Sequence, residues 1–275
     1  MHGGGENTLA SRILAPILAV PHAALAIGFG FLIAPAGWLA RLVGTALDWS
    51  SPPLIATSND AAGLALLLGL VVKELPFLLL IMLQATRQAP VAAHLAVGRA
   101  LGYSQSAVWL RIILPQIWRQ VRLPVLVVQA YALSSVDMAI ILGPSNPPTL
   151  AVAVTRWFTA PDLSMIYPAS AGALAIAAIV AAASIGVVLV ERALAHLGKI
   201  WLRRGRRGRL ETLILRTAAG FGAVALSFGV LSLVVLLLWS FAFRWSFPAP
   251  LPESWSLRAW TSPQADWGRA TRYSL

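Results

Sequence analysis

The sequence predicts an all-α fold, a polytopic transmembrane helical bundle with about five spans. Of its 275 residues, 58% are hydrophobic and only 11% are charged, whereas soluble domains carry about 25% charged residues. The mean hydropathy is +0.76. The apolar residues form long runs, and the basic residues lie mostly in the segments between them. These observations exclude an ordinary water-soluble fold.

Five apolar stretches have the length that a membrane-crossing helix needs. About 20 apolar residues span the roughly 30 Å hydrocarbon core, where the backbone finds no hydrogen-bond partner except itself. The first stretch is too long for the apolar region of a signal peptide. The stretches run approximately from Ile13 to Ala34, Ala61 to Leu83, Leu123 to Leu142, Ala169 to Val190 and Thr217 to Phe243.

The basic residues predict the orientation. They concentrate in the 87–122 and 191–216 loops, whereas the segments after the first and third stretches carry single arginines, Arg41 and Arg156. Because cytoplasmic loops carry the excess of Lys and Arg, we expect the N-terminus and both basic loops in the cytoplasm and the tail after the fifth stretch outside. The net charge of +11 therefore indicates membrane orientation and contact with anionic lipids, above all at Arg203–Arg209, and no nucleic-acid partner.

The sequence predicts no enzyme, cofactor or metal site. There is no cysteine, and the four histidines are far apart. Neither a G-x-x-x-x-G-K-[ST] loop, nor a G-x-S-x-G turn, nor an H-E-x-x-H pair occurs, which argues against nucleotide hydrolysis and against a membrane hydrolase. We therefore expect no catalytic residue in this chain.

The 87–122 loop contains two short helical patterns. A helix is expected over 92–101, ended by Gly102 in a left-handed conformation. Ser104 is the expected N-cap of a second helix, and Pro115 is expected to stop that helix. The loop is thus predicted to be a bent amphipathic element on the cytoplasmic face.

In this loop the sequence resembles the membrane permeases of binding-protein-dependent ATP-binding-cassette (ABC) importers. Their cytoplasmic signature is Glu-Ala-Ala, three residues, Gly, nine residues and then I-x-L-P. The chain departs from it at the front, where Ala96, Val97 and Gly98 replace Glu-Ala-Ala. The resemblance implies that the loop couples the permease to an ATPase through Leu101, Gly102, Tyr103, Ile112, Leu114 and Pro115.

Further runs resemble the YnjC-type permeases, relatives of thiamine and ferric-iron permeases in which two repeats are fused. These runs include residues 18–23, 73–77, 133–144 and 147–152. The resemblance implies a type I importer fold with most of the first permease repeat in residues 1–195. A basic cytoplasmic linker over 196–216 and the start of a second, truncated repeat over 217–275 are expected to follow.

The same resemblance implies the function and the partners. The chain would be the bacterial inner-membrane permease subunit that passes a small solute from a periplasmic binding protein to the cytoplasm. The implied partners are an ABC ATPase dimer, which hydrolyses the ATP, that binding protein and the second permease repeat. The alternatives from the residues alone are a secondary transporter, which would need no coupling loop, and a non-transport membrane assembly subunit.

Three charged residues fall inside predicted spans. Lys73 and Glu74 lie near the middle of the second stretch, and Asp137 lies in the third. Such residues are costly in lipid and often mark a translocation path. Adjacent helical residues point about 100° apart, so Lys73 and Glu74 cannot pair face to face. We expect Lys73 to pair with Asp137, as a structural ion pair or on the solute path. Pro76 is expected to kink the helix there.

Overall fold

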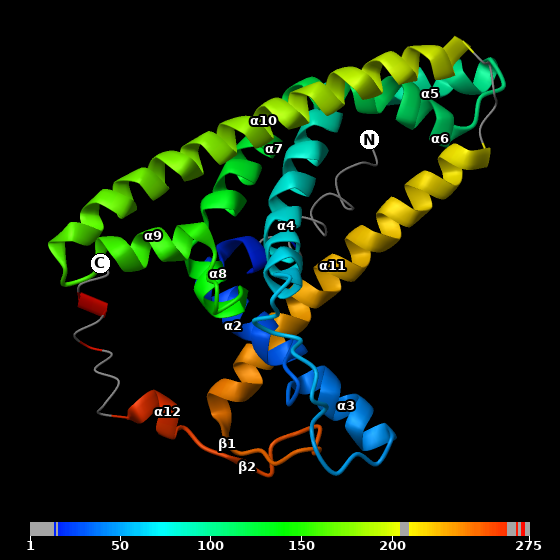
Figure 1. Cartoon of the computed structure of the whole chain (residues 1–275). Helices are drawn as coiled ribbons and strands as arrows, with labels where there is room; N and C mark the ends of the chain where they lie inside the picture. Colours follow the sequence, from blue (N-terminus) through cyan, green and yellow to red (C-terminus); the bar gives the residue numbers. More distant parts are fainter. Residues whose placement is uncertain (1–13, 15, 204–208, 263–267, 269–270, 273–275) are drawn as a thin grey trace.

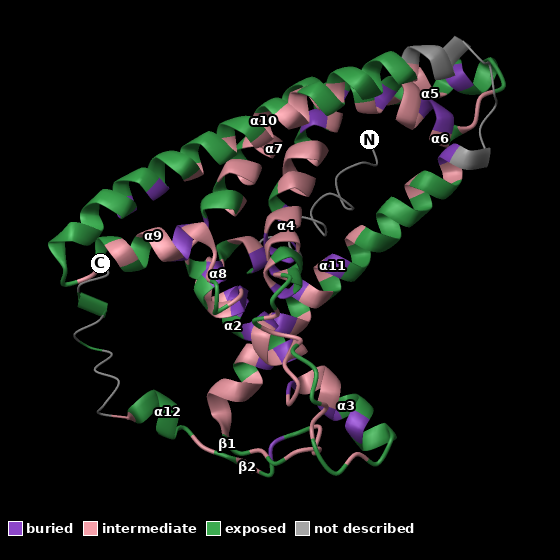
Figure 2. Cartoon of the chain, in the orientation of Figure 1, coloured by how far each residue is buried: buried purple, intermediate pink, exposed green. Residues whose placement is uncertain are grey.

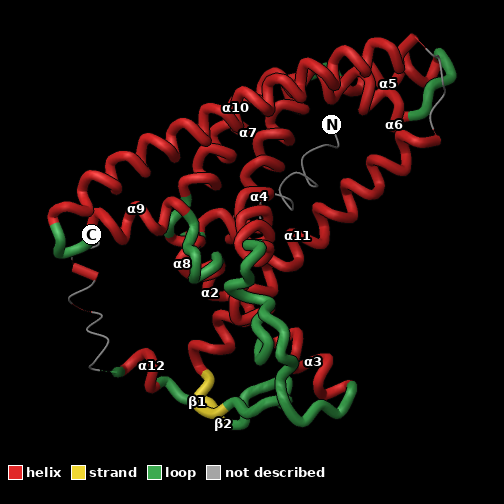
Figure 3. The backbone as a smooth tube through the Cα atoms, in the orientation of Figure 1, coloured by secondary structure: helices red, strands yellow, loops and turns green. Residues whose placement is uncertain are grey.

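A computed structural model describes residues 14, 16–203, 209–262, 268 and 271–272. Helices make up most of it, and the longest loop joins α3 to α4 (Figures 1 and 3). The elements are α2 (His22–Ile33), α3 (Trp38–Ala46), α4 (Leu64–Gln88), α5 (Val91–Ala100), α6 (Gln105–Val108), the π-helix η1 (Trp109–Ile113), α7 (Leu114–Ser134), α8 (Asp137–Leu142), α9 (Leu150–Phe158), the short 3-10 helix η2 (Leu163–Met165), α10 (Ile166–Arg203), α11 (Arg209–Phe241), the strands β1 (Ala242–Arg244) and β2 (Ser254–Trp255), and α12 (Arg258–Thr261).

The predicted all-α transmembrane bundle is confirmed. Within the described residues, four helical segments are long and apolar enough to cross a membrane: His22–Ala46, Leu64–Gln88, Leu163–Gly198 and Glu211–Phe241. The second, fourth and fifth predicted stretches fall on α4, α10 and α11. α10 extends beyond its apolar stretch at both ends, whereas α4 continues past the end of its stretch and α11 begins before the start of its stretch.

The third predicted span is wrong as a single helix. Residues 123–142 are divided between the end of α7 and the short α8. Ser135 has an extended backbone, with φ −65° and ψ 123°, and this breaks the helix. An average of hydropathy over the stretch does not detect such a local change of backbone conformation.

The first predicted span is also divided. Residues 16–19 are helical, but Pro21 has an extended backbone and α2 begins only at His22. Proline has no N–H to donate to the turn before it, so a helix tends to end there. Residues 13 and 15 of the predicted stretch lie outside the described residues.

The main core lies where α2, α4, α8 and α11 cross, as the buried colour in Figure 2 indicates. α2 and α11 approach so closely that a Cβ on Gly28 would lie 2.3 Å from the Ser232 carbonyl oxygen. Small residues commonly allow such close packing of membrane helices. The residues buried in this core are Ile17, Leu25, Ala26, Phe29, Val72, Met138, Leu142 and Ala225.

Arg41 holds together the end of the molecule formed by α3 and the β1–β2 hairpin (Figure 1). It is only 4% exposed. Its guanidinium donates to the carbonyl oxygens of Ala36 at 2.9 Å, Ser246 at 2.7 Å and Trp245 at 3.2 Å. This arginine, counted above as a loop charge, therefore fastens the segment after α11 to α3.

Candidate functional site: a candidate coupling segment and a polar cluster

The candidate coupling segment comprises α5, the turn at Gly102, α6 and η1, residues 91–113. It joins the end of α4 to the start of α7. Figure 1 shows it at the end of the molecule where α10 finishes and α11 begins, opposite α3 and the β1–β2 hairpin. The two basic loops, 87–122 and 191–216, thus lie together. Residues 204–208, which include most of the Arg203–Arg209 run, lie outside the described residues.

The turn between α5 and α6 has the conformation that the sequence predicts. Gly102 has φ 78°, in the left-handed region that glycine enters without steric cost. Its N–H donates to the Arg99 carbonyl at 2.9 Å. Ser104 caps α6 by accepting from the Ala107 N–H at 3.1 Å. Both local predictions are confirmed.

Gly98 permits the close packing of α5 on α6. A Cβ at this position would lie 2.2 Å from Cγ2 of Val108, far inside van der Waals contact. Gly98 occupies the last position of the Glu-Ala-Ala part of the signature, where this chain departs from the pattern. At this one position the departure therefore has a packing reason.

Pro115 does not stop the helix, so that prediction is wrong. Helix α7 begins at Leu114 and has Pro115 in its first turn. The turn before it is π-helical, and the Leu114 N–H donates to the Trp109 carbonyl five residues back. In a regular α-helix the ring of Pro115 would meet the carbonyl four residues earlier; the wider π turn accommodates it. The coupling segment consequently continues directly into α7.

The six signature residues divide between surface and interior. Leu101 is 64% exposed and Ile112 is 39% exposed, and Gly102 and Pro115 are also exposed. Tyr103 and Leu114 pack against an inner cluster formed by Ala85, Val108, Ile113, Ile117 and Val121. The first four residues are thus available to a partner, and the other two fix the segment to α4 and α7.

A connection to α11, which the sequence did not indicate, also holds the coupling segment. Arg111 of η1 forms an ion pair with Glu211 in the first turn of α11. Beside it, the Thr212 hydroxyl lies 3.1 Å from the Ser106 hydroxyl. The partners are about 100 residues apart in the chain, so no sequence spacing pointed to them.

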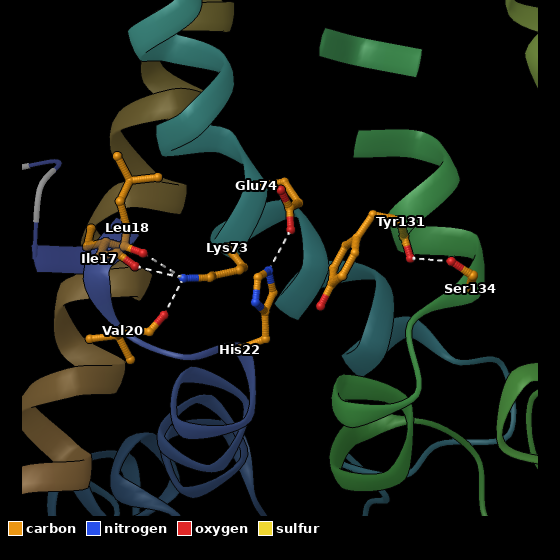
Figure 4. Close-up of polar contacts among 8 residues, drawn as sticks. All are labelled: Ile17, Leu18, Val20, His22, Lys73, Glu74, Tyr131 and Ser134. Carbon is orange, nitrogen blue, oxygen red and sulfur yellow. Dashed lines mark hydrogen bonds and ion pairs between the residues drawn. The ribbon is translucent and has the colours of Figure 1, made fainter. Parts of the chain in front are cut away.

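The second candidate site is a polar cluster, which we define as His22, Lys73, Glu74 and Tyr131 (Figure 4). Lys73 is buried, and its ammonium donates to the carbonyl oxygens of Ile17 at 3.0 Å and Val20 at 2.5 Å, with Leu18 at 3.4 Å. The helix break at Pro21 leaves these carbonyls without helical partners. Lys73 therefore provides the donors that the broken helix lacks.

Glu74 points elsewhere and meets His22. Its Oε1 lies 3.0 Å from His22 Nε2, and the His22 ring lies 4.7 Å from the Tyr131 ring of α7. The separation of Lys73 from Glu74 is as predicted, but His22 was missed. The rule on intramembrane ionisable residues also covers histidine, and His22 lies inside the first predicted span, so the rule could have found it.

The expected ion pair between Lys73 and Asp137 does not occur in the described part of the chain. The Lys73 ammonium turns to the break before α2, whereas Asp137 begins α8 and is exposed. Because Ser135 interrupts the helix, Asp137 does not lie on the continuous span from which its position was predicted.

One comparison with known proteins supplies a relative. The chain is 36% identical over 147 residues to the protein named "Inner membrane ABC transporter permease protein YnjC" of Escherichia coli (strain K12). The matched protein is a permease. The match covers 54% of this chain and 27% of the relative, so the chain spans about a quarter of the length of that protein.

The other two comparisons found nothing. No family model matches the chain. No solved structure matches it either. The relative and the four candidate spans together identify the chain as a multi-pass protein of the bacterial inner membrane.

Proposed function

We propose that this chain is the membrane-spanning permease part of an ABC importer, which moves a small solute from a periplasmic binding protein into the cytoplasm. A separate ATPase dimer supplies the energy. Residues 1–195 contribute most of one permease repeat, and residues 217–275 begin a second. The 196–216 linker contains the end of α10 and the start of α11.

The coupling segment is the observation that carries this proposal. Two short helices meet at the left-handed Gly102 and present Leu101 and Ile112 at the surface. They lie at the end of the molecule where the basic loops gather (Figure 1). A short exposed helix suits a groove on a partner protein, and movement of that partner would pass directly into α7.

The solute path is proposed to pass the polar cluster. Two helices are interrupted beside it, one before His22 and the other between Tyr131 and Asp137. Discontinuous helices commonly form solute sites in transporters. Glu74, His22 and Tyr131 face one another there (Figure 4), while Lys73 is engaged by the released carbonyls. Contacts with the solute are therefore assigned to Glu74, His22 and Tyr131, with the exposed Asp137 at the second helix break beside them. Lys73 is assigned a structural role.

A secondary transporter is the alternative that the broken helices favour. Such a protein also places ionisable residues beside interrupted helices, but it needs no ATPase. Substitution in the coupling segment would then leave transport intact. The two functions are separated by whether an ATPase associates through Gly102 and its neighbours.

The test compares Gly102→Val with Gly63→Val. Both glycines have positive φ, 78° and 69°, so each substitution introduces about 1–2 kcal/mol of backbone strain. Gly63 precedes α4, far from the coupling segment (Figure 1). We expect Gly102→Val to abolish co-purification of the ATPase, and Gly63→Val to preserve it, with both variants inserted in the membrane. Normal ATPase association of Gly102→Val would contradict the proposal.

A further inference from the structure

The ion pair between η1 and α11 is buried, although it joins two segments at the basic end of the molecule. The Arg111 and Glu211 side chains are only 5% and 2% exposed. The Ser106–Thr212 hydrogen bond, 3.1 Å long, lies one residue farther along α11. Two independent polar contacts therefore attach the coupling segment to one helix.

Burial makes this attachment stiff. A buried ion pair is costly to break, because separation leaves each charge without a partner in a poorly solvated site. Glu211 also lies in the first turn of α11, where the helix dipole favours a negative charge. The Arg111–Glu211 pair thus favours movement of α6, η1 and the start of α11 as one body.

The two helices that leave this body reach opposite sides of the polar cluster. α7 carries Tyr131. α11 crosses α2, where Ser232 meets Gly28 and where Gly229 packs against Ile17 and Val72. α2 begins at His22, whose ring faces Tyr131.

We propose that Glu211 is a positioning residue that fastens the coupling segment to α11, so that movement of the ATPase reaches the polar cluster through α7 and α11 together. This inference rests on the proposed function. Without Glu211, α7 would move alone and the two sides of the cluster would not be driven in concert.

The first experiment tests the attachment without an ATPase. Because the sequence has no cysteine, the double substitution Ser106→Cys and Thr212→Cys gives a defined pair. In the full-length protein in native membranes, mild oxidation should form the disulfide rapidly. Adding Glu211→Gln should slow its formation severalfold, and the exchange Arg111→Glu with Glu211→Arg should restore it. No disulfide in the otherwise wild-type background would overturn the proposal.

The second experiment tests transmission. Nitroxide labels at Ile27→Cys on α2 and Leu133→Cys on α7, both partly exposed, report the distance across the polar cluster. In the complex with its ATPase, ATP with vanadate should change this distance. Glu211→Gln should reduce the change severalfold while ATP hydrolysis and ATPase association persist, and the charge exchange should restore it.

The matched control is Glu191→Gln. Glu191 of α10 pairs with Arg122 of α7 at 3.2 Å. Neither residue belongs to the coupling segment, so the removal of this pair should leave the distance change intact. An unaltered change in Glu211→Gln would overturn the transmission role. Failure of the wild-type protein to bind any ATPase would instead overturn the proposed function, and with it the transmission role. The disulfide experiment would still decide whether the coupling segment is attached to α11.

Discussion

At the scale of single residues, the helix break at Pro21 explains the environment of Lys73. Proline removes one donor and redirects the chain, so the carbonyls of Ile17, Leu18 and Val20 need another source of hydrogen bonds. Lys73 supplies three donors on one flexible side chain and reaches all three oxygens. Its charge is thereby accommodated without a carboxylate, and Glu74 remains available to His22.

A double-mutant cycle tests this account of Lys73. Lys73→Met should destabilise the protein by about 3 kcal/mol, because buried acceptors left unsatisfied cost about 1–3 kcal/mol each. Asp137→Asn should cost little, since Asp137 is exposed. The two losses should add to within about 0.5 kcal/mol when thermal unfolding is followed in detergent. Rescue of Lys73→Met by Asp137→Asn would mean that the two residues are partners after all.

Local features of the site could be predicted from the sequence, but its long-range contacts could not. Gly102 and Ser104 act through backbone groups within a few residues, so the residue type and its position in the local sequence indicate their roles. His22 and Glu74 are 52 residues apart, and Arg111 and Glu211 are 100 apart. Such pairs depend on how helices pack, and hydropathy carries no information on which polar residues meet.

At the scale of elements, the apolar stretches predicted helices where the backbone is regular. α4, α10 and α11 each coincide with most of a long apolar run. The predictions failed where one residue changes the backbone within such a run: Pro21 before α2 and Ser135 after α7. At Pro115 the error was the reverse, because the π turn η1 absorbs a proline that was expected to end the helix.

The crossing of α2 and α11 is tested by matched glycine substitutions. In Gly28→Ala the new Cβ would lie 2.3 Å from the Ser232 carbonyl oxygen, whereas in Gly30→Ala it would lie 3.5 Å from Leu142. Gly28→Ala should therefore force the helices apart and cost about 2 kcal/mol, seen as a lower thermal midpoint in detergent. Gly30→Ala should be close to neutral. Equal stability of the two variants would contradict the close crossing.

At the scale of the whole molecule, composition and loop charge predicted the class of protein and the grouping of its loops. The two basic loops lie at one end, and α3 with the β1–β2 hairpin lies at the other (Figure 1). The number of spans was harder to predict, since the first and third stretches are interrupted. The side of the membrane on which each end lies remains a prediction from the positive-inside rule.

Reporter fusions test this orientation. A reporter joined after Arg207 should lie in the cytoplasm, because Arg207 belongs to a basic loop. A reporter joined at Asn146, in the segment after α8, should lie in the periplasm. Asn59, in the loop before α4, donates to the Gly143 carbonyl at 2.8 Å, so a third fusion at Asn59 should agree with the one at Asn146. Activity of all three on one side would refute the orientation.

Photo-crosslinking of the coupling segment tests the central claim most directly. A photoreactive residue would replace Leu101, which is 64% exposed beside Gly102. The control position is Leu54, which is fully exposed in the loop between α3 and α4. On illumination in native membranes, Leu101 should give an adduct that mass spectrometry identifies as a protein with a G-x-x-x-x-G-K-[ST] nucleotide-binding loop, and Leu54 should not. Absence of that adduct at Leu101, or an equal yield from Leu54, would contradict the assignment of this segment as the ATPase contact.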